Sequence, residues 1–199
     1  MDNQEKKTKK IDYEYEKKFL DDYMNSLRFF EPFLFKKMYR TGALASKIGQ
    51  TFGVEDNEYY LAGFYANIGL QAMDNLLTKT FLDEREKEQI KRHPVLASEF
   101  LKYKGLEKCA ELVYYHHELP DGSGYYGFDN YPIEACYINI ADTFEGSITP
   151  KSYRPALTLK EALDVTLKPY KNGLKIPLEQ VKEIEKILIN FYNETILGV

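Results

Sequence analysis

Three histidines and one aspartate are the residues of this sequence best suited to metal chemistry. His93 precedes a proline, and His116 and His117 are adjacent near the end of a predicted helix. Neutral imidazole is the commonest ligand of first-row transition metals, and a carboxylate such as Asp142 adds oxygen character that suits iron, manganese or zinc. The four residues lie on three predicted helices, and sites inside helical bundles are built in this way. Metal binding is therefore the first chemistry to consider for them.

Each of these residues also has an ordinary structural explanation. A His-Pro pair often marks a junction between helices, and two adjacent histidines point about 100° apart on an ideal helix. Asp142 alone could cap a helix or form a salt bridge. The spacing by itself does not decide between metal ligation and these structural roles.

Composition favours a single cytoplasmic domain. A chain of 199 residues fits one hydrophobic core. Its formal charge of -4 gives no general attraction for DNA or RNA, so neither is expected as a partner. No apolar run is long enough to span a bilayer, and the charged N-terminus lacks the apolar stretch of a signal peptide, so no membrane contact is expected. Cys109 and Cys136 have no zinc-like spacing, which fits a reducing compartment.

Apolar periodicity predicts an all-α helical bundle. Residues 1–30 form a charged tail and a lead-in helix, and residues 31–199 form the helical domain. Asp83 with Glu86 and Thr158 with Glu161 are capping-box signatures, and the proline after His93 should bend or restart a helix. Strands are at most marginal, because no segment shows a sustained alternation of apolar and polar residues. The predicted helices cover 11–30, 32–53, a segment capped by Asp56 or Asn57 and reaching Ile68, 83–92, 93–104, 106–117, 133–148 and 177–196.

A longer string of residues resembles the C-terminal half of HD-GYP domains in its order and gaps. The residues Leu76-Leu77-Thr78-Lys79, Glu88 and Ile90, ahead of His93-Pro94, look like the stretch before the family's His-Pro ligand, so the resemblance extends over about residues 33–188. The string itself reads His116-His117-Glu118, Asp121-Gly122-Ser123-Gly124-Tyr125, Ile140-Ala141-Asp142-Thr143-Phe144, Tyr153-Arg154-Pro155-Ala156-Leu157 and Glu161-Ala162-Leu163.

This resemblance implies a helical bundle that encloses two or three metal ions, usually iron or manganese, and hydrolyses cyclic di-GMP. In such a site, metal ions activate a water and neutralise charge on the phosphodiester. The resemblance makes His93, His116 and His117 ligands of one metal and Asp142 a ligand of its neighbour. It also implies ligand-binding residues, in the namesake loop and near the phosphate-binding region: Asp121, Gly122, Gly124, Tyr125, Lys151 and Arg154.

The sequence departs from the family at the metal site itself. Ala66 and Asn67 stand where the family has its His-Asp pair, and Leu70 replaces a lysine that would face the phosphate. Alanine has no ligating atom, and asparagine lacks the charge with which an aspartate bridges two metals. Lys37 stands at the family's earliest histidine ligand. If Lys37 points into that metal position, it could pair with Asp142; otherwise its ammonium reaches solvent.

Three functions compete on these grounds. A non-catalytic signalling or binding module, related to cyclic di-GMP phosphodiesterases, is favoured by the missing ligands. A residual phosphodiesterase or phosphohydrolase using one metal is favoured by the surviving histidines. A role in binding a signalling protein, independent of nucleotide, ranks third. The expected cofactor is one iron, manganese or zinc ion held weakly or partially, or none, and the expected small-molecule partner is a cyclic dinucleotide.

Overall fold

The structure is a computed structural model that describes residues 13–54, 57–151 and 154–198. The predicted tail at residues 1–10, the candidate cap Asp56 and Tyr153 lie outside these ranges. The chain divides between Phe35 and Lys36 into two compact units, whereas the sequence placed its boundary after residue 30. Helix α1 (Tyr13–Phe30) lies in the first unit, and helix α2 (Pro32–Thr51) crosses the boundary.

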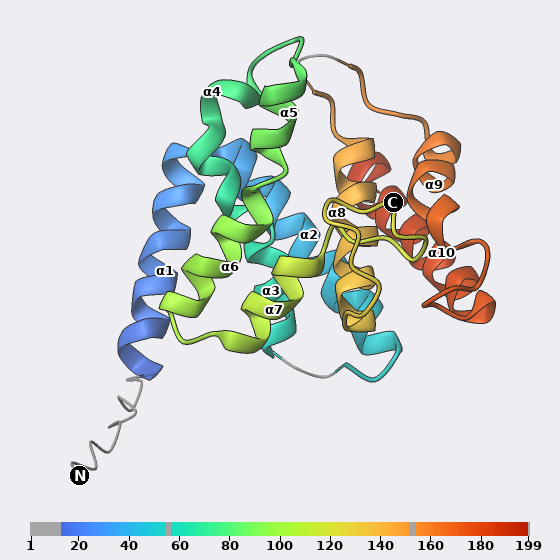
Figure 1. Cartoon of the computed structure of the whole chain (residues 1–199), viewed down its shortest axis with the longest axis horizontal. Helices are drawn as coiled ribbons and strands as arrows, with labels where there is room; N and C mark the ends of the chain where they lie inside the picture. The colour runs from blue at the N-terminus through green and yellow to red at the C-terminus, as the bar shows by residue number, and fades with distance from the viewer. Residues whose placement is uncertain (1–12, 55–56, 152–153, 199) are drawn as a thin grey trace. The chain divides into compact units, whose positions relative to one another are not determined.

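The second unit is helical, as predicted (Figure 1). Among the described residues there is no strand, only an isolated bridge between Lys151 and Arg154. The elements after α2 are α3 (Asn57–Tyr65), η1 (Ile68–Met73), α4 (Asp74–Leu77), α5 (Glu84–Ile90), α6 (His93–Tyr103), α7 (Glu107–Tyr115), α8 (Ile133–Ile148), α9 (Leu159–Leu167), η2 (Lys168–Tyr170), α10 (Leu178–Tyr192) and η3 (Asn193–Leu197).

Local chemistry sets several helix starts where the sequence placed them. The side chain of Asp83 accepts a hydrogen bond from Glu86 N, and that of Thr158 accepts one from Glu161 N, so both predicted capping boxes are confirmed. Helix α6 begins at His93 with proline in its first turn, which confirms the predicted restart. The start of α6 fixes the direction in which His93 leaves the backbone.

The predicted helix reaching Ile68 is wrong at its C-terminal end. Helix α3 ends at Tyr65, and Ile68 begins the 3-10 segment η1 after a turn at residues 66–67. In η1, Gly69 packs so tightly on the start of α6 that an added Cβ would lie 2.2 Å from His93 O. The turn directs Asn67 toward α8, and the glycine lets η1 support His93.

The core of the second unit forms around α8, most of whose residues are buried. Helix α6 packs on α7, α7 on α3 and α8, and α8 on α9 (Figure 1). Close approach of α2 and α3 is allowed by Gly42 and Gly63, because a Cβ on Gly63 would lie 2.9 Å from Ala45 Cβ. This packing places Lys37 and Arg40 of α2 opposite α8. No helix in the described ranges combines the length and apolar character that a bilayer-spanning helix needs.

Candidate metal centre

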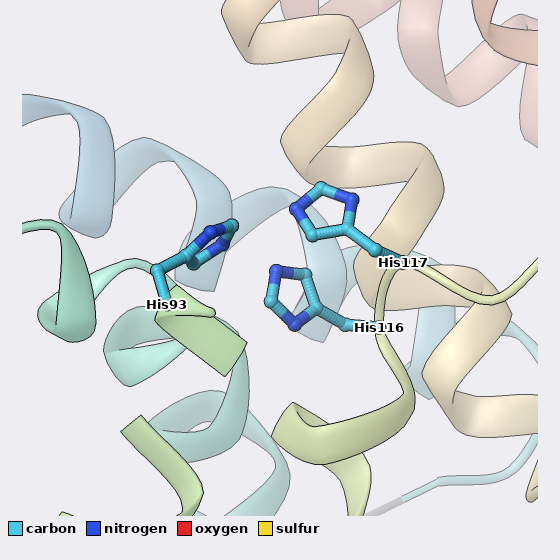
Figure 2. A group of neighbouring side chains, drawn as sticks. All are labelled: His93, His116 and His117. Carbon is cyan, nitrogen blue, oxygen red and sulfur yellow. The ribbon is translucent and has the colours of Figure 1, made fainter. Parts of the chain in front are cut away.

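The three histidines converge in the interior of the second unit and are called the three-histidine cluster below. His93 comes from the first turn of α6, and His116 and His117 come from the end of α7 (Figure 2). On an ideal helix, the side chains of adjacent residues point about 100° apart. Helix α7 ends at Tyr115, so this angle does not apply to His116 and His117, and their ring centroids lie 4.1 Å apart. The ring of His93 lies 5.3 Å from that of His116 and 5.0 Å from that of His117.

Backbone carbonyls orient two of the rings. Nδ1 of His93 lies 2.8 Å from Ile90 O, and Nδ1 of His116 lies 2.6 Å from Val113 O. A carbonyl only accepts, so both Nδ1 atoms carry the proton and both Nε2 atoms have a lone pair. These Nε2 atoms are buried and have no hydrogen-bond partner among the described residues. Metal-binding histidines are held in this way, with one nitrogen bonded to a carbonyl and the other facing the metal.

The three-histidine cluster has the charge state that a metal needs. Burial, together with the neighbouring His116, lowers the pKa of His93 from its ordinary 6.5 to about 3. Burial also lowers the pKa of His116 and takes the pKa of His117 well below its usual value. The imidazoles are therefore neutral near physiological pH, and neutral imidazole is the form that ligates metals.

The spacing of the cluster fits one metal ion if the three rings move together on binding. One ring nitrogen from each histidine lies within 4.8 Å of the others. Metal–nitrogen bonds are about 2.1 Å long, so three nitrogens arranged evenly around one ion lie about 3.4–3.6 Å apart. Binding an ion would then draw a pair of nitrogens together by at most about 1.4 Å, the difference between 4.8 Å and the shorter of these spacings. The residues present fit a single transition-metal ion.

Beside the histidines, Lys37, Asn67 and Asp142 form what we call the Asp142 cluster. Lys37 Nζ of α2 lies 2.5 Å from Asp142 Oδ1, which confirms the contact predicted from sequence. Asn67 Nδ2 donates to the same oxygen at 2.5 Å. The other oxygen, Oδ2, lies 3.8 Å from His117 Nε2. Asp142 thus lies beside the three-histidine cluster, and Lys37 and Asn67 already donate to one of its oxygens.

The electrostatics of this cluster extend one turn along both helices. Burial alone would raise the pKa of Asp142, but the Lys37 ammonium, together with the neighbouring His117 and His116, more than offsets burial and keeps that pKa well below the usual value. One turn further on α8, the buried Glu145 has its Oε2 3.9 Å from Lys37 Nζ and its Oε1 3.9 Å from Arg40 Nη1. Two cations of α2 therefore balance two carboxylates of α8.

Two positions at which the sequence predicted substitutions of the family's motif, Ala66 and Leu70, are apolar and enclosed. Ala66 is fully buried and Leu70 is 8% exposed. Neither side chain offers an atom that binds a metal or a phosphate. Asn67 is thus the polar side chain that this turn contributes to the Asp142 cluster.

The loop after α7 is fixed to the cluster through Tyr125. Its ring stacks on His117 at 4.3 Å between centroids, whereas Asp121 is exposed and accepts from Ser123 N at 3.0 Å and Ser123 Oγ at 2.6 Å. Gly122 has φ +74°, which favours glycine. At Gly124 an added Cβ would lie within 2.7 Å of the His117 carbonyl oxygen. The structure thus brings Tyr125 to the histidines and leaves the Asp121 carboxylate in its own turn.

The two basic residues of the predicted ligand-binding set have different surroundings. Burial, with the neighbouring Lys37, lowers the pKa of Lys151. Arg154 uses its guanidinium at the end of α8, where Nη2 donates to Gly146 O at 2.7 Å and Nη1 to Ser147 O at 3.3 Å. Their roles in binding phosphate stay predictions.

Sequence reasoning assigned no role to two further buried polar groups that position this centre. The carboxylate of Glu118 accepts from the loop amides of Tyr126 at 3.0 Å and Phe128 at 2.9 Å. Asn139 Nδ2 donates to His116 O at 2.8 Å, and its Oδ1 accepts from Tyr170 OH at 2.9 Å. The available signal was a polar residue inside an apolar stretch, because such a residue needs a buried partner.

Comparisons with known proteins identify the kind of domain. Residues 24–172 match a family model described as HD domain. Over 135 residues the chain is 29% identical to the cyclic di-GMP phosphodiesterase response regulator RpfG of Xanthomonas campestris pv. campestris (strain 8004), covering 62% of this chain and 36% of that protein. The solved structure of Bd1817, an HDG"Y"P protein from Bdellovibrio bacteriovorus, matches with a TM-score of 0.61 and 17% identity. That match covers 77% of this chain and 51% of Bd1817. The chain thus spans about a third of the curated relative and half of the solved structure.

Proposed function

The chain belongs to the HD domain family, within the HD-GYP/HD superfamily, and from this premise we propose that it is a catalytically impaired signalling or binding module related to cyclic di-GMP phosphodiesterases. The observation that carries the proposal is the pair of donors on Asp142 Oδ1, which are Lys37 Nζ and Asn67 Nδ2. A carboxylate that would help to hold a second metal is bound to an ammonium and an amide instead.

Two-metal hydrolysis needs neighbouring ions that clamp both the attacking and the leaving oxygen. Ala66 offers no ligand, and Asn67 turns its amide nitrogen, a donor, toward Asp142. Removing a supporting residue around a metal site typically costs about 10–100-fold in affinity or activity, so the loss of direct ligands should cost more. Weak turnover or none follows.

Binding of a cyclic dinucleotide is supported by what the site retains. The four charges of Lys37, Arg40, Asp142 and Glu145 cancel, so a divalent ion on the neutral three-histidine cluster would leave the pocket cationic. A cationic pocket attracts a phosphodiester. On this proposal the phosphates and bases contact the residues predicted from sequence: Asp121, Gly122, Gly124, Tyr125, Lys151 and Arg154.

The unpartnered Nε2 atoms of His93 and His116 favour one alternative, a residual phosphodiesterase that uses a single metal. An iron, manganese or zinc ion held there would polarise a phosphodiester oxygen and lower the pKa of a water. In this alternative, Lys37 and the histidines keep the same places, and slow hydrolysis accompanies binding.

Binding and turnover of cyclic di-GMP, measured on the same manganese-loaded preparation, test the proposal. We expect saturable binding by calorimetry and no steady release of linear dinucleotide by chromatography. His117→Ala should weaken binding, whereas Tyr103→Ala, which removes an 84% exposed ring, should not. Steady product release that His117→Ala abolishes would favour the single-metal enzyme. Absence of binding would contradict the proposed function.

A further inference from the structure

We propose that Lys37 is a resident cation that replaces a second divalent ion beside Asp142, so that the pocket accepts at most one such ion, on its histidines. The inference rests on the proposed function, because it specifies how many ions the same pocket holds. It concerns a residue that comes from α2, not from the helices that carry the histidines.

The first support is the occupancy of the Asp142 carboxylate. Lys37 Nζ and Asn67 Nδ2 both lie 2.5 Å from Oδ1, so two donors already share this oxygen. A divalent ion would need the same lone pairs. It would also lie next to an ammonium, and like charges at this distance repel strongly where water is largely excluded.

The second support is the charge balance around Lys37. Its Nζ lies between Asp142 Oδ1 at 2.5 Å and Glu145 Oε2 at 3.9 Å, while Arg40 approaches the other oxygen of Glu145 at 3.9 Å. Two carboxylates thus face two permanent cations. No negative charge of this group is left to compensate the two charges of an added ion.

The third support is the enclosure of the ion pair. The side chains of Lys37 and Asp142 are only 16% and 9% exposed, so water competes little for their contact. A buried carboxylate without a cation would be costly, and Lys37 removes that cost without a metal.

The number of manganese ions bound per chain tests the inference. The full chain is stripped with a chelator, titrated with manganese in a calorimeter and analysed by elemental mass spectrometry after gel filtration. Lys37→Met should bind one more ion per chain than the wild type, because Asp142 and Glu145 lose their internal cation. Lys36→Met removes the neighbouring, exposed lysine and should match the wild type.

A second variant guards against misfolding. Lys37→Gln keeps an amide donor for Asp142 but carries no charge, so it should also gain one ion. Electron paramagnetic resonance should show isolated manganese in the wild type and an exchange-coupled pair in the Lys37 variants. Two ions in the wild type, an unchanged count in the Lys37 variants, or an equal gain in Lys36→Met would each overturn the inference.

The experiment separates this inference from the proposed function. Ions are counted without nucleotide, so a protein that binds no cyclic dinucleotide would end the proposed function and leave the count intact. Conversely, a second ion in the wild type would end the inference and leave the measured binding of nucleotide intact.

Discussion

Replacing Lys37 with methionine should destabilise the protein by about 3 kcal/mol in the absence of metal. Removing one partner of a buried ion pair costs about 3–5 kcal/mol, because the other charge stays buried. Asp142 would keep the hydrogen bond from Asn67 Nδ2, and both partners are slightly exposed, at 16% and 9%. These two features place the cost at the lower end of the range.

The assay is urea unfolding followed by far-UV circular dichroism in the presence of a chelator. A loss of 3 kcal/mol should also lower Tm by about 6–12 °C for a chain of this size. Asp142→Asn alone leaves Lys37 without its carboxylate and should be destabilising. The double variant buries no uncompensated charge, so the cycle should give a coupling free energy of about 2 kcal/mol. Lys36→Met should stay within about 0.5 kcal/mol of the wild type, as exposed substitutions do.

Two results would refute this reasoning. If Lys37→Met unfolds within about 0.5 kcal/mol of the wild type, the ammonium does not compensate a buried charge. If the double variant loses the sum of the two single losses, Lys37 and Asp142 do not act on each other. Either result would also remove the electrostatic reason for a single-ion pocket.

Three further predictions concern the groups around the pocket. In a thermal melt, manganese at about 100 times its dissociation constant should raise Tm of the wild type by about 5–11 °C. His116→Ala should lose this rise, and a variant that keeps it would show that His116 is not a ligand. Gly69→Ala should cost at least about 3 kcal/mol in urea unfolding, because its Cβ would lie 2.2 Å from His93 O. In the control Gly146→Ala, the added Cβ would meet only Lys37 Nζ, at 3.9 Å, so this variant should be neutral or gain up to about 1 kcal/mol. Equal effects of the two variants would contradict the steric argument. Glu118→Gln should lower the free energy of unfolding by about 1.5–3 kcal/mol, because one of the two charge-assisted hydrogen bonds from the loop amides is lost. The variant should also be cleaved faster in the loop after α7 by a protease, and cleavage at the wild-type rate would contradict this role of Glu118.

The fold was predictable where a local signal fixes a helix end. The segment predicted at 133–148 is helix α8 to the residue, because a proline precedes it and apolar residues fill it. The restart at His93 follows from Pro94, which cannot donate a backbone bond. The end of α3 was not predictable in this way, because the turn at Ala66 depends on how η1 packs against α6. This packing is a tertiary effect, so the periodicity of apolar residues in the sequence does not predict it.

The site was predictable to the extent that residue types limit partners. A buried carboxylate needs a cation, so once the resemblance assigned both residues to one pocket, Lys37 became a candidate partner of Asp142 beside the alternative of an ammonium that reaches solvent; the structure shows the pairing. The direction in which Asn67 turns its amide could not be read from sequence, since the group both donates and accepts. Glu145 was missed because its role depends on tertiary packing. Helix α2 places Lys37 and Arg40 one turn apart opposite α8, and only this arrangement shows that Glu145 has two cations beside it.

The three substituted positions of this pocket compensate one another. Asp142 is buried, so it must meet a cation, and Lys37 supplies that cation from within the chain. Asn67 is compatible with Lys37, because a second carboxylate there would leave two anions sharing one ammonium, a costly arrangement without a metal. Ala66 offers no metal ligand, which is compatible with a pocket whose cation is Lys37. On the proposed function, the Lys37 ammonium makes a metal ion unnecessary for burying Asp142, and it also occupies the place of a second ion in hydrolysis. Stability without metal and weak catalysis would then both follow from one lysine.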